Sequence, residues 1–296
     1  MRLSAMGIEV AESAFEPLGR TALRVLGRLP GGLTEHLLFT ELPGRTFRQK
    51  AVQRLLRGPR PVRVHFVAGP IAGYEFDCST AERYFLLGAR YETAVVEVLS
   101  SLIRPGDVVY DVGAHAGFSA LVFARLAVGG RVYAFEPSPS TFARLLHNVE
   151  LNHAAGVRPV NAGAWDRPGQ LRLAENSSWS RVIDDDASVD LPVSDVRLLR
   201  LDDFVYRDGE RPATLLKVDI EGNAARCLAG AREMLRRARP RVVLEIHHAA
   251  EHRDCLAILQ EHGYDVRALE STRRYPYHLM AAVPSAQPAA PAALTG

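Results

Sequence analysis

The chain has 296 residues, of which 47% are hydrophobic and 24% are charged, and its formal net charge is +2. This length allows one large domain or two small ones with a sizeable core. The composition excludes a wholly disordered chain, a collagen-like repeat and a small disulfide-stapled scaffold. The near-neutral charge gives no overall attraction to nucleic acid or to a membrane surface, so neither is expected as a partner.

Cysteine usage and the N-terminal sequence favour a cytoplasmic location. The three cysteines, Cys78, Cys227 and Cys255, lie far apart and form no C-x-x-C motif. A disulfide framework and a zinc knuckle are therefore not favoured, and a reducing compartment is expected. Three glutamates among the first 16 residues interrupt the apolar run of a signal peptide. The longest uncharged stretch, residues 275–296, contains four prolines and cannot form a membrane span.

The first part of the chain, residues 1–88, is predicted to be an extension of helices and short strands. Residues 1–60 indicate two or three helical segments, broken at two Pro-Gly positions. Residues 62–67 and 73–77 flank a Gly-Pro turn and are typical of two short strands. Residues 90–103 carry apolar side chains at helical spacing, and the following Pro-Gly pair ends that helix.

From residue 107 onward, short apolar runs alternate with helical segments. Strands are predicted at 107–113, 131–136, 157–163, 214–222 and 241–248, with later candidates at 264–269 and 277–283. Helices are predicted at 117–126, from the N-cap Ser138 to 151, from 222 to 237, and at 250–262. This alternation predicts an α/β fold with a doubly wound, mostly parallel sheet over residues 89–283. The Ala- and Pro-rich tail, residues 284–296, is predicted to be disordered.

The ends of the first two predicted strands carry the residues of a nucleotide site. The first strand runs into Asp111-Val112-Gly113-Ala114-His115-Ala116-Gly117, and the second ends in Phe135-Glu136-Pro137. In an open α/β sheet, ligands bind beyond the carboxyl ends of the strands. Gly113 and Gly117 let the backbone turn sharply and approach a ligand closely. The Glu136 carboxylate can accept hydrogen bonds from both hydroxyls of a ribose.

The spacing of this loop distinguishes between two classes of cofactor. A dinucleotide fold has G-x-G-x-x-G, but His115 stands here where the middle glycine would be. The Asp111 carboxylate would repel a pyrophosphate and attract an ammonium or sulfonium group, so the pattern favours S-adenosylmethionine. A nicotinamide oxidoreductase is the enzymatic alternative. The structural alternative is an ordinary glycine-rich turn with solvated carboxylates.

Two later strands place ionisable residues on one side. Lys217, Asp219 and Glu221 alternate along one predicted strand, and Glu245 and His247 alternate along the next. Such groups are costly in a central strand unless they are paired, so we expect them to converge at one edge of the sheet. Carboxylates with a histidine can supply a general base or a divalent-metal site. The alternative is a buried salt-bridge network in which Lys217 and Glu245 hold neighbouring strands together.

The combination of D-V-G-A-x-x-G, F-E-P and K-x-D-x-E-G resembles the FkbM-type S-adenosylmethionine-dependent methyltransferases. Matching stretches, among them RVYAFEPSPSTFARLLHNVELN, LLKVDIEGNAARCLAGAREMLRRARP and VVLEIHH, run in the family's order over residues 88–250. The resemblance implies a class I, Rossmann-like methyltransferase fold with a seven-stranded sheet. It also implies O-methylation, mostly of sugar or natural-product hydroxyls. N- or carboxyl-methylation on the same scaffold and a non-catalytic S-adenosylmethionine-binding protein are the alternatives.

The resemblance also assigns site residues. The cofactor-binding candidates are Asp111, Gly113, Ala114, His115, Gly117, Phe118, Glu136, Pro137 and Glu92, with Ala162, Gly163 and Ala164 bordering the adenine. Two departures from the family pattern are His115, where Asn is usual, and Asn223-Ala224-Ala225, where an acidic residue usually follows E-G-x. No metal ligand is assigned, although the carboxylates and the histidine expected at one edge of the sheet leave divalent-metal binding as an open alternative.

His247 is the first candidate for the general base, because a histidine ordinarily titrates near neutrality. Asp219 is the second candidate, or the group that orients the base, and Lys217, Glu221 and Glu245 complete the catalytic candidates. The alternative for His247 is a histidine at a strand end whose side chain is capped by backbone groups.

The acceptor is expected to be a small molecule, and the sequence leaves a homodimer open. Residues 42–74 contain seven basic residues and no acidic one. The pattern between Arg45 and Arg57 predicts a basic helix that could cap the crevice and attract an anionic acceptor. A phosphorylated or nucleotide-linked sugar and a carrier-linked thioester are examples. The alternative is a solvated helix face.

Overall fold

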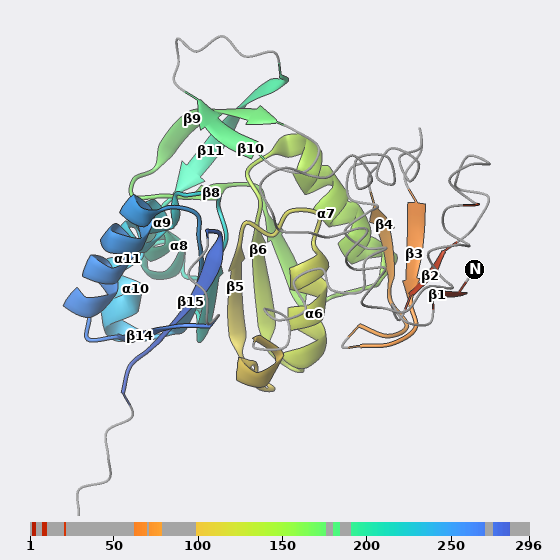
Figure 1. Ribbon diagram of the computed structural model, residues 1–296, viewed down its shortest axis with the longest axis horizontal. Helices are drawn as coiled ribbons and strands as arrows, with labels where there is room; N and C mark the ends of the chain where they lie inside the picture. The colour runs from red at the N-terminus through yellow and green to blue at the C-terminus, as the bar shows by residue number, and fades with distance from the viewer. Residues whose placement is uncertain are drawn as a thin grey trace, which may run out of the picture.

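The computed structural model describes residues 2–3, 8–10, 21, 62–69, 71–78, 99–175, 180–183, 191–269 and 275–284 (Figure 1). The predicted basic helix, the boundary at residue 88 and the tail beyond residue 284 lie outside the described residues. Within the predicted helix over 90–103, the described residues 99–102 are helical. None of the helices in the described ranges has the length and hydrophobicity that a membrane span requires.

A seven-stranded sheet forms the centre of the molecule. Its strands are β5 (Val108–Val112), β6 (Arg131–Phe135), β7 (Val157–Val160), β12 (Leu215–Val218), β13 (Arg241–Ile246), β14 (Asp265–Ala268) and β15 (Tyr277–Ala282). The order is β14-β15-β13-β12-β5-β6-β7, and β15 runs antiparallel to both of its neighbours. The pairs joining β13, β12, β5, β6 and β7 are all parallel. The predicted α/β class with a doubly wound, mostly parallel seven-stranded sheet is thereby confirmed.

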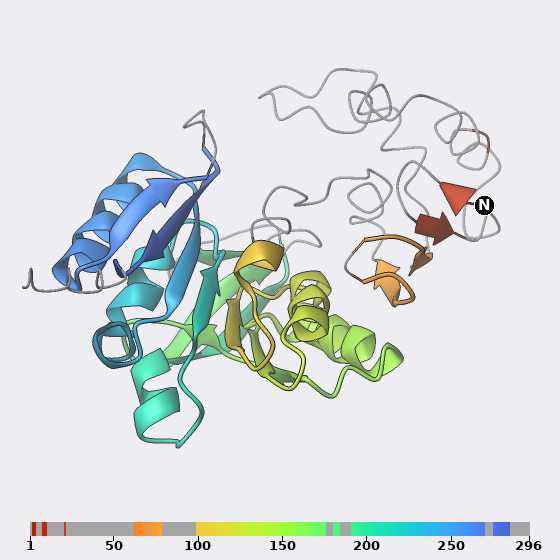
Figure 2. The same cartoon turned by 90° about the horizontal axis from the view of Figure 1, so that it is seen from below.

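Helices cover both faces of this sheet (Figure 2). They are α6 (Phe118–Leu126), α7 (Pro139–Leu151), α8 (Leu201–Tyr206), α9 (Ala224–Ala229), α10 (Arg232–Arg237) and α11 (Ala249–Glu261). Val109 of β5 packs in the core with α6 and α7, whereas Val108 and Tyr110 pack in the core with α8 to α11. Successive residues of a strand face opposite sides, and both sides are buried here, which explains the continuous apolar runs.

Two predicted helix features had different outcomes. Ser138 is the N-cap of α7, as predicted, and its hydroxyl accepts a hydrogen bond from the Thr141 N–H at 3.2 Å. The single helix predicted over 222–237 is wrong, because α9 ends before Gly230 and α10 begins at Arg232. A Cβ at Gly230 would lie 1.8 Å from the Trp165 carbonyl oxygen, so the chain passes too close to another segment for a side chain there.

Two smaller sheets flank the central one (Figure 1). The N-terminal sheet orders β1 (Arg2–Leu3), β2 (Ile8–Val10), β3 (Val62–Phe66) and β4 (Glu75–Cys78). This confirms both predicted strands after residue 60 and corrects the helical prediction for residues 2–3 and 8–10, because β2 supplies the antiparallel partner of β3. The third sheet orders β10 (Ser180–Ile183), β9 (Gly169–Glu175), β11 (Val193–Leu199) and β8 (Gly163–Ala164). The strand predicted over 157–163 is thus divided between β7 and β8.

Candidate active site

The candidate site lies where the carboxyl ends of four parallel strands meet. β12 pairs with β5 on one side and with β13 on the other, which confirms that the two strands rich in ionisable residues are neighbours. Both strands end earlier than predicted, at Val218 and Ile246, so Asp219, Glu221 and His247 follow the strands. Glu221 has a φ of 50°, a left-handed conformation that ends strand alternation at that point.

The loop of residues 113–117 is held tightly between β6 and β12. Gly113 has a φ of 83°, and a Cβ at this position would lie 1.8 Å from the Asp219 carbonyl oxygen. The N–H groups of Gly113 and Ala114 both donate to the Phe135 carbonyl at 3.0 Å. Glycine is therefore required by a close backbone approach as well as by its φ angle.

The rest of this loop leads into α6. Gly117 is the N-cap of α6 with a φ of 96°, and a Cβ there would lie 2.7 Å from Cδ1 of Leu145 on α7. His115, the residue that departs from the family pattern, has a φ of 50°. Non-glycine residues seldom adopt this conformation, and it commonly marks functional turns.

The Glu136 carboxylate is fixed at the end of β6. It is 6% exposed, and its two oxygens accept the backbone N–H groups of His115 at 3.1 Å and Ser138 at 2.9 Å. The side-chain amide of Asn161 donates to the carbonyls of Glu136 and Pro137 at 2.9 and 3.1 Å. A carboxylate has about four acceptor positions, so a group oriented in this way suits the hydroxyls of a ribose.

Asp111 has a different environment from the one the sequence suggested. Its side chain is fully buried, the Ser119 hydroxyl donates to Oδ2 at 2.6 Å, and the Lys217 ammonium lies 3.1 Å from Oδ1. The carboxylate was expected to attract a cationic ligand, but a cation of the protein itself already lies beside it. Asp111 thus helps to fix the start of the loop of residues 113–117.

Lys217 connects the loop of residues 113–117 to Asp219. Its side chain is 6% exposed, and Nζ donates to the Gly113 carbonyl at 3.2 Å and lies 3.5 Å from Oδ2 of Asp219. Burial raises the pKa of Asp219, but the Lys217 charge, a hydrogen bond with Glu245 and the charges of His247 and His278 together outweigh burial and hold the pKa below its usual range. Asp219 is therefore ionised at neutral pH.

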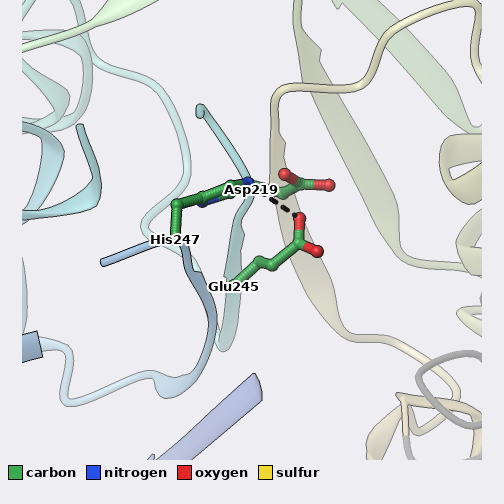
Figure 3. Close-up of side chains that lie close together, drawn as sticks. All are labelled: Asp219, Glu245 and His247. Atoms are coloured by element: carbon green, nitrogen blue, oxygen red, sulfur yellow. Dashed lines mark ion pairs between the residues drawn. The ribbon is translucent and has the colours of Figure 1, made fainter. Parts of the chain in front are cut away.

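Asp219, Glu245 and His247 point toward one another, as Figure 3 shows. His247 is 18% exposed, and its Nε2 lies 3.5 Å from Oε2 of Glu221 and 3.6 Å from Oε2 of Glu245. Each of the three residues in the figure offers one ligand atom, and these atoms lie within 4.8 Å of one another. Carboxylate and imidazole ligands suit a divalent cation, although Lys217 already supplies positive charge beside Asp219.

Glu251 is a site residue that sequence reasoning missed. Its buried carboxylate accepts the N–H groups of Ala224 and His247, both at 2.8 Å, and Oε2 lies 3.8 Å from Nδ1 of His247. Burial raises the pKa of Glu251, but the nearby His247 imidazole and the N–H groups of His247 and Ala224 together outweigh burial and lower the pKa. The signal was a glutamate four residues after His247, at the start of a predicted helix.

The environment of His247 favours its protonated form. Burial lowers the pKa of His247, but the Glu251 carboxylate, with Glu221 and Asp219, outweighs burial and raises the pKa above its ordinary value. The next residue, His248, is the N-cap of α11, and its Nδ1 accepts the Glu251 N–H at 3.1 Å.

The remaining cofactor candidates have different surroundings. Ala114, Ala162 and Ala164 are buried, and Gly163 and Ala164 form β8 beside β11. The ring of Phe118 packs 5.7 and 6.1 Å from the rings of Phe66 and Phe76, so it contacts the N-terminal sheet. Glu92 lies outside the described residues.

Comparison with known proteins identifies a matching family model and several relatives. A family model described as the methyltransferase FkbM domain matches residues 111–266. The 31-O-demethyl-FK506 methyltransferase FkbM of Streptomyces tacrolimicus is 32% identical over 197 residues, which cover 56% of this chain and 75% of the relative. The hexuronic acid methyltransferase AglP of Haloferax volcanii is 28% identical over 188 residues, covering 62% of this chain and 74% of the relative. The solved structure of methyltransferase FkbM from Methylobacillus flagellatus has 18% identity and a TM-score of 0.43, covering 69% of this chain and 54% of that chain.

Proposed function

The chain belongs to the FkbM family of S-adenosylmethionine-dependent methyltransferases, and we propose that it methylates a hydroxyl group of a sugar-containing or polyhydroxylated small molecule. The relatives named for 31-O-demethyl-FK506 and for hexuronic acid support an acceptor of this class. The observation that carries the proposal is the position of His247, with the neighbouring carboxylates of Glu221 and Glu245, at the strand ends beside the loop of residues 113–117.

The residues that follow β5, β6 and β7 suit the proposed cofactor. Glu136 would accept from the ribose hydroxyls, the loop of residues 113–117 would hold the methionine end, and residues 162–164 would border the adenine. When bound, S-adenosylmethionine supplies a methyl group on a positively charged sulfur. The carboxylates around Asp219 give this edge a negative potential that favours such a cation.

His247 is the proposed general base. Its Nε2 is the nitrogen nearest the acidic edge and would take the proton of the acceptor hydroxyl. Its Nδ1 faces Glu251, whose carboxylate would stabilise the imidazolium that forms. A positioned general base typically contributes about 10²–10⁴-fold to the rate. Asp219, held ionised by Lys217, is a weaker base and would orient the imidazole or the acceptor hydroxyl.

The test is a methyl-transfer assay with S-adenosylmethionine and a panel of hydroxylated acceptors, followed by mass spectrometry. His247→Ala should lower kcat by about 10²–10⁴-fold and leave S-adenosylhomocysteine affinity unchanged. His248→Asn is the matched control, because Asn is also a good N-cap, and it should retain nearly full turnover. Equal turnover in wild type and His247→Ala would refute the assigned base.

The chemical nature of the product tests the class of acceptor atom. An ether methyl group, stable to mild base, is expected from hydroxyl methylation. A base-labile methyl ester or an N-methyl product would show carboxyl or amine methylation on this scaffold. Tight S-adenosylhomocysteine binding without turnover on any acceptor would favour a non-catalytic binding protein.

A further inference from the structure

Strand β4, at the edge of the N-terminal sheet, lies beside helix α7 (Figure 1). Two asparagine side chains of α7 hydrogen-bond to the backbone of β4. Asn152 accepts the Glu75 N–H at 2.8 Å and donates to the Glu75 carbonyl at 2.7 Å. Asn148 accepts the Asp77 N–H at 2.8 Å and donates to the Asp77 carbonyl at 3.5 Å. Each carboxamide therefore pairs with both backbone groups of one strand residue, as a neighbouring strand would.

The spacing of the two asparagines matches the strand. Four residues of an α-helix rise about 6 Å, and two residues of a β-strand span about 6.6 Å. Asn148 and Asn152 lie four residues apart, and their partners Glu75 and Asp77 lie two residues apart on the same edge. The pairing satisfies an edge that would otherwise be exposed, so it fixes the N-terminal sheet on the central domain.

Asn148 makes one contact that Asn152 does not make. Its Nδ2 also donates to the Ala116 carbonyl at 2.9 Å, inside the loop of residues 113–117. Asn148 is fully buried, so a hydrogen bond lost here is not replaced by solvent. One side-chain amide therefore bonds at once to the N-terminal sheet and to the cofactor loop.

Neighbouring contacts strengthen this connection. The ring of Phe118, the first residue of α6 after the loop, packs against Phe66 of β3 and Phe76 of β4. On α7, Nε2 of His147 lies 2.7 Å from Oδ2 of Asp77. Movement of the cofactor loop would disturb the same surface on which the sheet is docked.

We infer that Asn148 is a positioning residue that couples cofactor binding to docking of the N-terminal sheet. This inference rests on the proposed function, because it takes residues 113–117 as the cofactor loop. Coupling between two sites is reciprocal. A cofactor that orders the loop therefore stabilises the docking of β4 on α7, and loss of the contact between Asn148 and β4 weakens cofactor affinity.

Hydrogen–deuterium exchange with and without S-adenosylhomocysteine, together with calorimetry, tests the coupling. In the wild type, the ligand should slow exchange in peptides that contain residues 113–117 and in peptides that contain residues 75–78. Asn148→Ala should raise the Kd for S-adenosylhomocysteine about tenfold and abolish the ligand-dependent protection of residues 75–78. Asn148→Asp, which keeps the side-chain size but cannot donate to the Ala116 carbonyl, should behave in the same way.

Asn152→Ala is the matched control, because it loses the same kind of contact with β4 and keeps the bond to the loop. It should speed exchange at residues 75–78 with a Kd within about threefold of wild type. Equal loss of affinity in the Asn148 and Asn152 variants would show general destabilisation and overturn the inference, as would wild-type affinity in both Asn148 variants. Absence of binding in the wild type would instead contradict the proposed function.

Discussion

Replacing Lys217 with methionine should destabilise the fold by about 3–5 kcal/mol, because it leaves a buried carboxylate without its counter-charge. Asp111 is fully buried and its Oδ1 lies 3.1 Å from the Lys217 ammonium. Methionine has a similar length but supplies no charge, so it isolates the electrostatic term. The Gly113 carbonyl also loses its hydrogen-bond donor. A typical hydrogen bond stabilises the fold by about 0.5–1.5 kcal/mol, and the total destabilisation given above includes this contribution.

Replacing the other member of the pair, Asp111, should destabilise the fold by less than replacing Lys217 does. In Asp111→Asn, the Lys217 ammonium keeps Asp219 at 3.5 Å and the Gly113 carbonyl at 3.2 Å. The double variant Asp111→Asn with Lys217→Met should recover much of the loss of Lys217→Met, because replacing both members of a buried ion pair is often nearly neutral. The coupling energy of this cycle should therefore be large, about 2–3 kcal/mol.

Urea unfolding followed by circular dichroism measures these differences. The urea midpoints can be compared directly only if the variants share one m-value, the slope of the unfolding free energy against urea concentration. A changed m-value would indicate a change in the denatured state or a third populated state. A loss below about 1 kcal/mol for Lys217→Met would refute the reasoning, since that is the value of an exposed ion pair. Losses that simply add in the double variant would refute it as well.

Four further outcomes are expected. Glu136→Ala should weaken S-adenosylhomocysteine binding by about 2–4 kcal/mol in calorimetry, because two charge-assisted hydrogen bonds to the ribose are lost. Gly113→Ala should lower stability by more than about 2 kcal/mol in thermal unfolding, because a Cβ there meets the Asp219 carbonyl oxygen at 1.8 Å. Turnover should increase with pH, with a midpoint above pH 6.5, because the pKa of His247 is raised and a general base must be neutral. Glu251→Gln removes a carboxylate that raises this pKa, so it should move the midpoint to lower pH. EDTA should leave turnover unchanged, and a loss restored by Mg²⁺ would instead place a metal at Asp219, Glu245 and His247.

The raised pKa of His247 also has a consequence for stability. Because the folded state binds this proton more tightly than the unfolded state, the protonated imidazole stabilises the fold below the unfolded pKa. The contribution is lost as pH rises through the folded pKa. Wild type and His247→Ala should therefore differ more in urea midpoint at pH 5.5 than at pH 8.5, and an equal difference at both pH values would contradict this assignment.

The sequence was sufficient to predict the features that depend on short-range patterns. Continuous apolar runs such as Val108–Val112 predict strands buried on both faces, and parallel strands bring their carboxyl ends to one edge. These patterns predict that Glu136 and the ionisable residues after β12 and β13 lie at one site. Gly113 and Gly117 were also identified, because turns of this kind require glycine.

Features that depend on how helices dock could not be predicted. The sequence shows that Glu251 begins a helix, but only the docking of α11 on α9 brings its carboxylate to the Ala224 N–H. Asn148 and Asn152 share one side of α7, yet no periodicity indicates that their partner is the edge of a strand more than 70 residues away in the chain. Such contacts join distant segments, so local sequence patterns carry no information about them.

The partner of Lys217 shows why alternation along a strand is not enough. Alternation puts Lys217 and Asp219 on one side of β12, but two strands flank β12 and either could supply the counter-charge. The register decides, because Lys217 lies opposite Asp111 on β5 and opposite the apolar Val243 on β13. Asp111 is thereby neutralised, so an attraction for a sulfonium group cannot come from that carboxylate alone. Under the proposed function it would come instead from the edge as a whole, where the carboxylates of Asp219, Glu221, Glu245 and Glu251 outnumber Lys217 and a protonated His247.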